Sequence, residues 1–151
     1  MTSFRWRLSV FAILVVGVSI RGTSQRTTMD RRVSALIEET TRRNTEQKAF
    51  ADLEALGCPA VPAIIRLMDD RRNLPDRQIS LRNKSPEAFE GTRHYGPEEV
   101  VDALAAILNQ VTGQDFGFIF NGATAEERSK AVKGWREFLA STPTSKLCEG
   151  G

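Results

Sequence analysis

The sequence predicts an all-α domain, a small bundle of antiparallel helical hairpins with one long irregular loop. Apolar residues recur at helical spacing in several separate segments, and glycine or proline stands where those segments end or restart. Almost nothing in the pattern favours a sheet. A chain of 151 residues with 40% hydrophobic and 26% charged residues has the size and composition of one ordinary globular domain.

The first 24 residues have the three parts of a secretory signal. Arg5 and Arg7 form a basic start, residues 8–20 carry no charge, and the small residues Gly22 and Ser24 follow at the spacing that signal peptidase prefers. The apolar run is shorter than the roughly 20 residues that span a bilayer. We therefore predict export to the periplasm or the medium, with an uncleaved membrane anchor as the alternative. Cleavage removes only basic residues, and the slightly acidic chain that remains argues against a nucleic-acid partner.

Residues 25–44 are expected to form a short polar linker, residues 25–30, and a first helix. The helical spacing begins with Val33 and Ile37, and the polar stretch 40–48 indicates either one long helix or a break near Asn44. Gly57 ends the helical pattern that follows, and Pro59 opens the next helix, which is expected to end around residue 70.

Residues 71–96 form the irregular loop, in which residues 78–82 are compatible with a short strand that has Ile79 and Leu81 on one face. A strong helix follows over residues 97–113 and is apolar over most of its circumference, which predicts a central position in the bundle. Thr124 and Glu127 form a capping box that opens the last helix.

The two cysteines, Cys58 and Cys148, do not lie in metal-ligand spacing, and we expect no metal and no cofactor. An even number of cysteines in an exported protein favours a disulfide between them, with two free thiols as the alternative. Residues 141–151 are otherwise predicted to be a flexible tail.

Residues 45–71, TEQKAFADLEALGCPAVPAIIRLMDDR, resemble one unit of the HEAT or HEAT-like helical repeats, with the turn at Gly57 and Pro59 between two helices. The region 101–139 is similar to the C-terminal segments of exported, uncharacterised bacterial proteins with helical repeats, in which a TG-x-x-FG loop precedes a charged helix that contains a tryptophan. The resemblance implies a HEAT-like helical domain over residues 45–140. It also implies a role in protein binding or scaffolding without catalysis.

The long loop carries the candidate polar site. Basic residues outnumber acidic ones there, and a phosphate or an acidic glycan is the anion that they would bind. His94 is a candidate general base, which defines the alternative function of a small exported enzyme or ligand-binding protein. No nucleophile elbow or paired-carboxylate motif accompanies His94, so the prediction is a protein that is not an enzyme. The residues of this candidate site are Arg77, Arg82, Lys84, Arg93, His94 and Tyr95.

Residues 115–122, DFGFIFNG, are the candidate apolar site. The DFG triplet of protein kinases acts with a glycine-rich loop, a strand lysine and a catalytic loop, and this chain has none of these motifs. The alternation of Phe116, Phe118 and Phe120 predicts a short extended stretch with one face inward, mostly buried between the last two helices. If Phe118 or Phe120 is exposed, it becomes a candidate contact for the expected partner, another protein.

Overall fold

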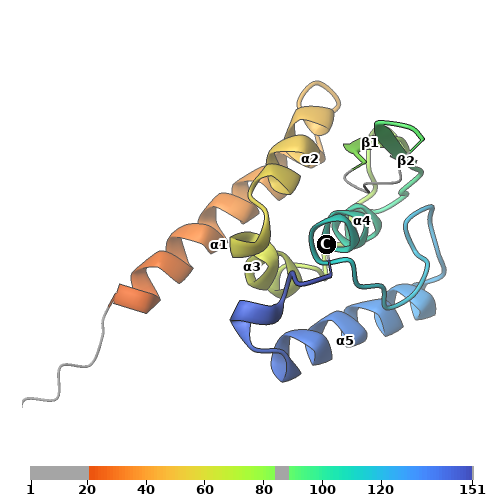
Figure 1. Ribbon diagram of the computed structural model, residues 1–151. Helices are drawn as coiled ribbons and strands as arrows, with labels where there is room; N and C mark the ends of the chain where they lie inside the picture. The colour runs from red at the N-terminus through yellow and green to blue at the C-terminus, as the bar shows by residue number, and fades with distance from the viewer. Residues whose placement is uncertain (1–20, 84–88, 151) are drawn as a thin grey trace, which may run out of the picture.

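The computed structural model describes residues 21–83 and 89–150, in which five α-helices and one β-hairpin follow one another along the chain (Figure 1). The predicted helices are therefore present, but the prediction of a purely all-α fold is wrong. Nearly all of the expected signal peptide, residues 1–24, lies outside the described residues.

Helix α1 (Arg21–Thr40) begins earlier than predicted, because residues 25–30 continue the helix and do not form a linker. Polar side chains are tolerated there because α1 extends away from the rest of the domain at this end (Figure 1). Val33 and Ile37 are buried further along, where α1 packs against α2. The helix then breaks at residues 41–45, where the hydroxyl group of Thr45 donates to the main-chain oxygen of Glu39 over 2.8 Å.

Helix α2 (Glu46–Ala55) leads through a short 3-10 helix (Cys58–Ala60) into helix α3 (Val61–Arg66). Helix α3 is shorter than predicted and does not reach residue 70. The carboxylate of Asp70 accepts the main-chain N–H of Arg72 over 3.0 Å, and this local turn replaces a further helical turn. Met68 is nevertheless buried, as the helical spacing indicated.

Helix α4 (Val100–Thr112) lies in the centre of the domain, in contact with α2, α3 and α5, as predicted (Figure 1). It begins three residues later than the predicted start at Pro97. Asp102 accepts the main-chain N–H groups of Glu98 and Glu99, both over 3.0 Å, and this hydrogen bonding marks the first turn. Gly113 ends the helix in the left-handed conformation (φ 70°), which costs glycine little because it has no Cβ.

Strands β1 (Ile79–Arg82) and β2 (Thr92–Tyr95) form an antiparallel hairpin, with Ile79 opposite Tyr95 and Arg82 opposite Thr92. Ile79 and Leu81 are buried, as expected for β1. Strand β2 was not predicted, because its sequence, TRHY, has no apolar alternation. Main-chain pairing with β1 specifies it instead.

The aromatic loop, residues 114–123, departs from the predicted alternation. Ile119 and Phe120 are buried and Phe116 is half-buried, but Phe118 is 72% exposed. Gly117 adopts a φ of 128°, and its main-chain oxygen accepts the N–H of Ile119 over 3.0 Å. This tight turn breaks the extended conformation, so Ile119 takes the inward position that the alternation assigned to Phe118.

Helix α5 (Ala125–Ser141) begins at the predicted capping box, in which the N–H of Thr124 donates to Glu127 over 2.8 Å. Contrary to the prediction of a flexible tail, the chain stays attached to the domain as far as residue 148. It forms a short 3-10 helix (Thr144–Lys146), and Leu147 is buried. Cys148 is joined to Cys58 by the predicted disulfide, with a Cα–Cα distance of 6.0 Å.

A buried ion pair joins α5 to the start of α4. The Nε and Nη2 atoms of Arg128 donate to the two carboxylate oxygens of Asp102 over 2.7 and 2.8 Å, and Nη1 donates to Glu99 over 2.8 Å. The side chain of Asp102 is fully buried and that of Arg128 is 6% exposed. The hydrogen bond to Asp102 raises the pKa of Arg128 above its ordinary value, so the guanidinium group stays protonated.

Replacing Arg128 by leucine is expected to lower the free energy of unfolding by about 3 to 5 kcal/mol, because the Asp102 carboxylate is then left buried without its partner. Urea unfolding followed by circular dichroism measures the change. The matched control is Lys133→Leu on the exposed side of α5, which should change stability by less than about 0.5 kcal/mol. A loss below about 1 kcal/mol for Arg128→Leu would contradict the structural importance of the pair.

Glu46, in the first turn of α2, holds the beginning of the long loop. Its carboxylate is buried and accepts the main-chain N–H of Asp76 over 3.0 and 3.3 Å. Burial raises the pKa of Glu46 from its ordinary 4.5 to about 7, although the hydrogen bond from Asp76 acts in the opposite direction.

We expect Glu46 to make folding stability depend on pH. The folded protein binds this proton more tightly than the unfolded chain, so the contribution of Glu46 is complete below about pH 4.5 and is lost as the pH rises to about 7. The variant Glu46→Gln should therefore gain up to about 3 kcal/mol relative to the wild type between pH 4 and pH 8. Unfolding curves of both proteins across this range test the shift, and parallel pH profiles would show that the pKa of Glu46 is ordinary.

Candidate functional site

An open groove of about 580 Å³ runs between β2 and the aromatic loop, and we call it the aromatic groove. It brings together five of the residues that the sequence nominated, three from β2 and two from the loop. Figure 1 shows the two segments on the same flank of the domain, next to α4. The lining residues are Asn83, Glu90, Thr92, Arg93, His94, Tyr95, Asn109, Asp115, Phe118 and Phe120.

Gln110 of α4 holds β2 in place beside the groove. Its side-chain oxygen accepts Nη1 of Arg93 over 3.1 Å and the hydroxyl group of Tyr95 over 3.4 Å. Its amide nitrogen donates to the main-chain oxygen of Arg82 at the end of β1. One side chain of the central helix therefore contacts both strands, and it adds to the burial of Ile79 and Leu81, which attaches β1 to the core.

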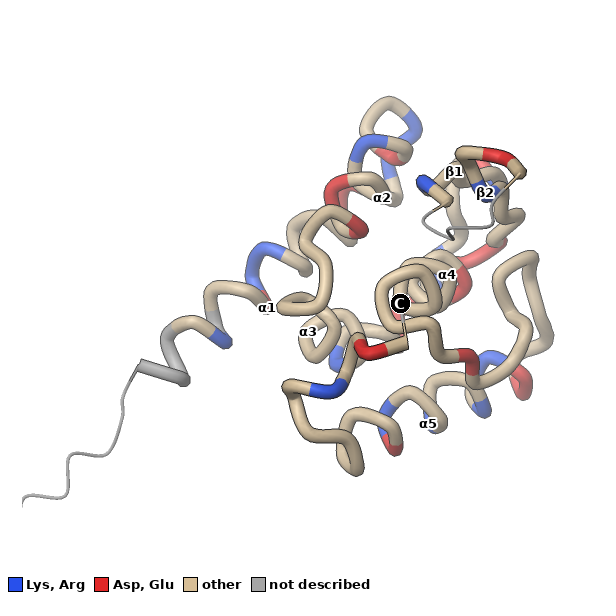
Figure 2. Tube along the Cα trace, viewed as in Figure 1, with Lys and Arg blue, Asp and Glu red and all other residues tan. Residues whose placement is uncertain are grey.

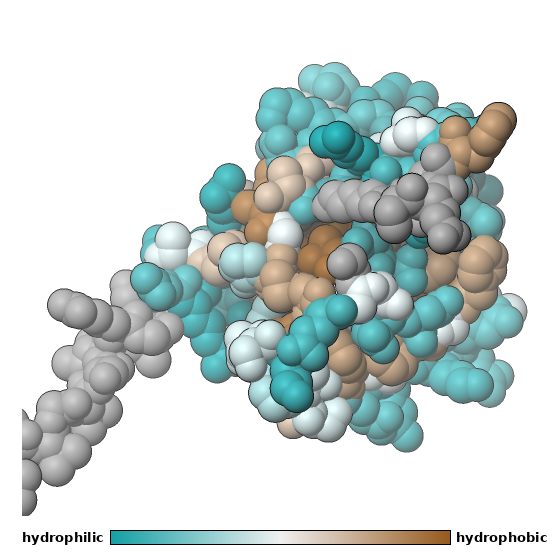
Figure 3. Space-filling view, in the orientation of Figure 1, coloured by the Kyte–Doolittle hydropathy of each residue, from teal (hydrophilic) through white to brown (hydrophobic). Residues whose placement is uncertain are grey.

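The opposite wall of the groove is aromatic. Phe120 is buried and meets Tyr95 edge-on at 5.8 Å between ring centroids, and Phe118 packs edge-on against Phe120 at 5.2 Å. Phe118 is nonetheless 72% exposed, and Phe89, which precedes the groove residue Glu90, is fully exposed. Figure 3 shows apolar patches on this flank of the molecule. Burying a phenylalanine is worth about 2 to 3 kcal/mol, so the exposed ring of Phe118 at the groove indicates a contact surface.

His94 and Tyr95 do not face one another, because successive side chains of a strand point to opposite sides. Tyr95 lies on the inner side with Gln110, whereas His94 lies on the exposed side, where its Nδ1 is 2.9 Å from the hydroxyl oxygen of Ser80. The two side chains therefore reach the aromatic groove from opposite faces of the hairpin.

The three basic candidates among the described residues, Arg77, Arg82 and Arg93, do not converge on one anion site. Arg77 pairs with Glu98 at 3.4 Å outside the groove. Arg82 and Arg93 belong to opposite faces of the hairpin, because Arg82 lies opposite Thr92 and not opposite Arg93. Lys84 lies outside the described residues. Along α2 and α5, basic and acidic residues are interspersed (Figure 2).

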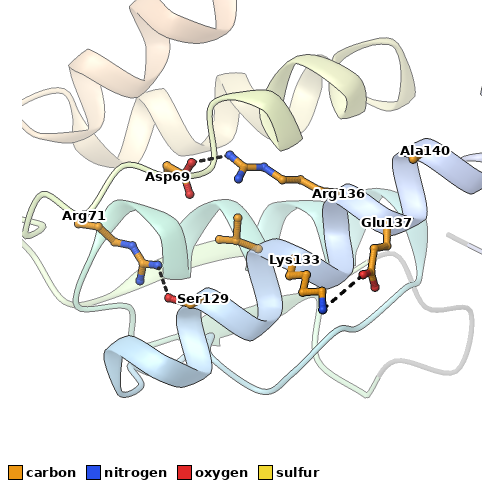
Figure 4. A pocket seen from close by; sticks show the side chains of 8 residues that line it. Asp69, Arg71, Ser129, Lys133, Arg136, Glu137 and Ala140 are labelled. Carbon is orange, nitrogen blue, oxygen red and sulfur yellow. Dashed lines mark hydrogen bonds and ion pairs between the residues drawn. The ribbon is translucent and has the colours of Figure 1, made fainter.

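A second depression, of about 410 Å³, lies between α5 and the connection from α3 to α4 (Figure 4). Its charged side chains contact one another. Arg136 pairs with Asp69, the Nη2 atom of Arg71 donates to Ser129 over 3.3 Å, and Lys133 lies 3.7 Å from Glu137. These pairs leave little charge directed at a ligand, so this depression is not the candidate site.

A larger depression, about 940 Å³, lies between the start of α1, α3 and the end of α5, with Met29, Pro62 and Leu139 among its apolar residues and Arg26 and Arg32 among its charged ones. Sequence reasoning missed this depression as well as the one beside α5. No pattern along the chain marks either of them, because their residues come from segments far apart in the sequence.

The described part of the chain contains no group of three or more His, Cys, Asp or Glu side chains that could hold a metal ion. In the same residues, no helix has the length and apolar character needed to cross a membrane.

The chain matches no protein-family model, no curated protein and no solved structure.

We expect Gln110→Leu to release the hairpin from α4 without unfolding the helices, because it removes three hydrogen bonds to the two strands. Hydrogen–deuterium exchange should become faster at residues 79–95 and stay unchanged in α4 and α5. The control Gln25→Leu, on the exposed side of α1, should leave both regions unchanged. Unchanged exchange of the hairpin in Gln110→Leu would show that other contacts hold it.

Proposed function

We propose that this chain is a non-catalytic, exported helical module that binds another protein through the aromatic groove. The observation that carries the proposal is the exposure of Phe118 beside two buried neighbours, Ile119 and Phe120. The loop has an anchored side and a free side, so Phe118 is presented on a rigid support. Rigid aromatic residues at a concave surface are characteristic of protein-binding hot spots.

The surroundings of His94 favour binding over catalysis. In the described part of the chain its hydrogen-bond partner is the hydroxyl group of Ser80, on the exposed face of the hairpin. A general base acts best where water is excluded and where a further group orients its ring. The hydroxyl group of Ser80 orients the ring, but the open face of the hairpin does not exclude water, which is why the alternative of a small enzyme built on His94 ranks second.

The relationship to HEAT-like proteins belongs to this proposal. Helices α2 and α3 follow one another through a tight turn at Gly57, as a HEAT-like unit requires. However, α3 has only six residues, and the β-hairpin separates it from α4 along the chain. These features support a relationship to HEAT-like proteins that is limited to a single divergent repeat unit within a compact domain.

Export is supported by the Cys58–Cys148 disulfide, because such bonds persist in oxidising compartments. It is also supported by the signal-like sequence of the first 24 residues. The binding partner would accordingly be an extracytoplasmic protein or an exposed part of a membrane protein.

Replacing Phe118 by serine is expected to abolish partner capture while leaving the fold intact, because the ring is mostly exposed. The tagged full-length protein is expressed in its producing organism, and captured proteins are quantified by mass spectrometry after crosslinking. Partners specific to the groove should fall at least tenfold in Phe118→Ser, with a change in unfolding free energy below about 0.5 kcal/mol.

The matched control is Phe89→Ser, which removes an equally large exposed ring that does not line the groove. It should retain the groove-specific partners. If both variants capture the same proteins as the wild type, the aromatic groove is not the binding surface and the proposal fails.

A further inference from the structure

One edge of β2 is unpaired and faces the aromatic groove. The N–H of Asn83 donates to the main-chain oxygen of Gly91 over 3.0 Å. In an antiparallel pair, hydrogen-bonded and non-hydrogen-bonded residue pairs alternate, so this bond identifies which residues of β2 bond to β1. Residues 91, 93 and 95 therefore direct their main-chain groups toward β1. Thr92 and His94 direct theirs away from it, and within the described residues no hydrogen bond is formed by these outward N–H and C=O groups.

The aromatic loop already satisfies one position of this edge. Gly96 continues the same alternation past the end of β2, and its N–H donates to the side-chain oxygen of Asn121 over 2.7 Å. An acceptor from the loop thus stands where the oxygen of a neighbouring strand would be. This contact shows that the outward main-chain groups point toward the loop side of the hairpin, where the groove opens.

We propose that the free edge of β2 takes up an extended segment of a partner protein as a third strand. This inference rests on the proposed binding function and names the partner's conformation and chemistry. The added segment would pair with Thr92 and His94 and would end where Asn121 blocks the edge. At about 3.3 Å per residue, such a strand has about four to six residues in contact with the groove.

The groove also defines the side chains of the segment. Alternate residues of an added strand lie on one face, and there they would pack against the exposed ring of Phe118. An apolar residue is therefore expected at that position, with a polar residue on each side of it.

The charge of the groove favours a basic segment. Asp115 is exposed, and the hydrogen bond that its carboxylate accepts comes from the neutral main-chain N–H of Gly117 over 2.8 Å. Glu90, at the other end of the groove, is exposed as well. Arg93 lines the same groove, but its guanidinium group is held on the inner side by Gln110. A lysine or arginine two positions before or after the apolar residue lies on the same face of the added strand and would meet these carboxylates.

The experiment begins with a random nine-residue peptide library displayed on phage and selected on the full-length, disulfide-bonded protein. The selected sequences should contain an apolar residue with a lysine or arginine two positions away. Synthetic copies are then measured by fluorescence anisotropy. Phe118→Ser and Asp115→Asn should each weaken binding at least fivefold.

Strand addition is tested on both partners. Thr92→Pro removes one outward N–H from the free edge, where proline is tolerated, and it should weaken binding at least tenfold. Arg82→Pro removes an outward N–H from the opposite edge of the same hairpin and should have little effect. In case either variant fails to fold, N-methylated peptides are tested on the unchanged protein. Methylation should abolish binding at every second residue only, because only alternate amides pair with β2.

The outcomes separate this inference from the proposed function. Peptides that depend on Phe118 but are insensitive to Thr92→Pro and show no alternation on methylation would overturn strand addition and leave groove binding standing. Selected peptides rich in acidic residues would overturn the inference that the partner segment is basic. Dimers of the protein in sedimentation velocity that dissociate in Thr92→Pro would show that the edge pairs with a second copy. A library that yields no groove-dependent peptide, together with partner capture that is unaffected by Phe118→Ser, would reject both proposals.

Discussion

The ion pair between Arg128 and Asp102 is the interaction on which the rest of the structure depends. Asp102 has two functions, because its carboxylate binds the guanidinium group of α5 and also accepts the main-chain N–H groups that begin α4. A charge this deeply buried is tolerated only when its partner is held in a fixed geometry. The two fork-like hydrogen bonds of Arg128 supply that geometry, and they set the position of α5 against the central helix. Arg71 and Arg77 lie 3.9 and 3.4 Å from the neighbouring carboxylates, and they extend the network to the long loop.

The aromatic groove is a consequence of this arrangement. The aromatic loop joins α4 to α5, so both of its ends are placed by helices that the ion pair holds together. Phe116 rests on Trp135 of α5 at 4.8 Å between ring centroids, and Ile119 and Phe120 fill the interior, which leaves Phe118 as the residue that turns outward. On the other side, Gln110 of the same central helix holds β2. Both walls of the groove are therefore attached to α4, and such a surface can present an unpaired strand edge and an exposed ring without collapsing.

Local signals were enough to predict most of the helices. Thr124 and Glu127 mark the start of α5, Gly113 marks the end of α4, and the apolar circumference of α4 indicates its central position, because caps and burial patterns act within a few residues along the chain. The hairpin was only half predicted. Ile79 and Leu81 carry the alternation of a buried strand, whereas β2 is specified by pairing with β1 and by hydrogen bonds to Gln110, neither of which leaves a pattern in its own sequence.

The sequence by itself determined which segments are helical, where the central helix lies, and which residue types line the candidate site, including His94, Tyr95, Phe118 and Phe120. Only the tertiary structure decided how those residues relate. It placed His94 and Tyr95 on opposite faces of a strand, dispersed the basic residues among separate partners, and turned Phe118 outward in place of Ile119. The physical reason is that the direction of a side chain in a loop or an isolated strand depends on turns and pairings made with distant parts of the chain. The direction of a side chain on a helix follows from the regular geometry of the helix itself.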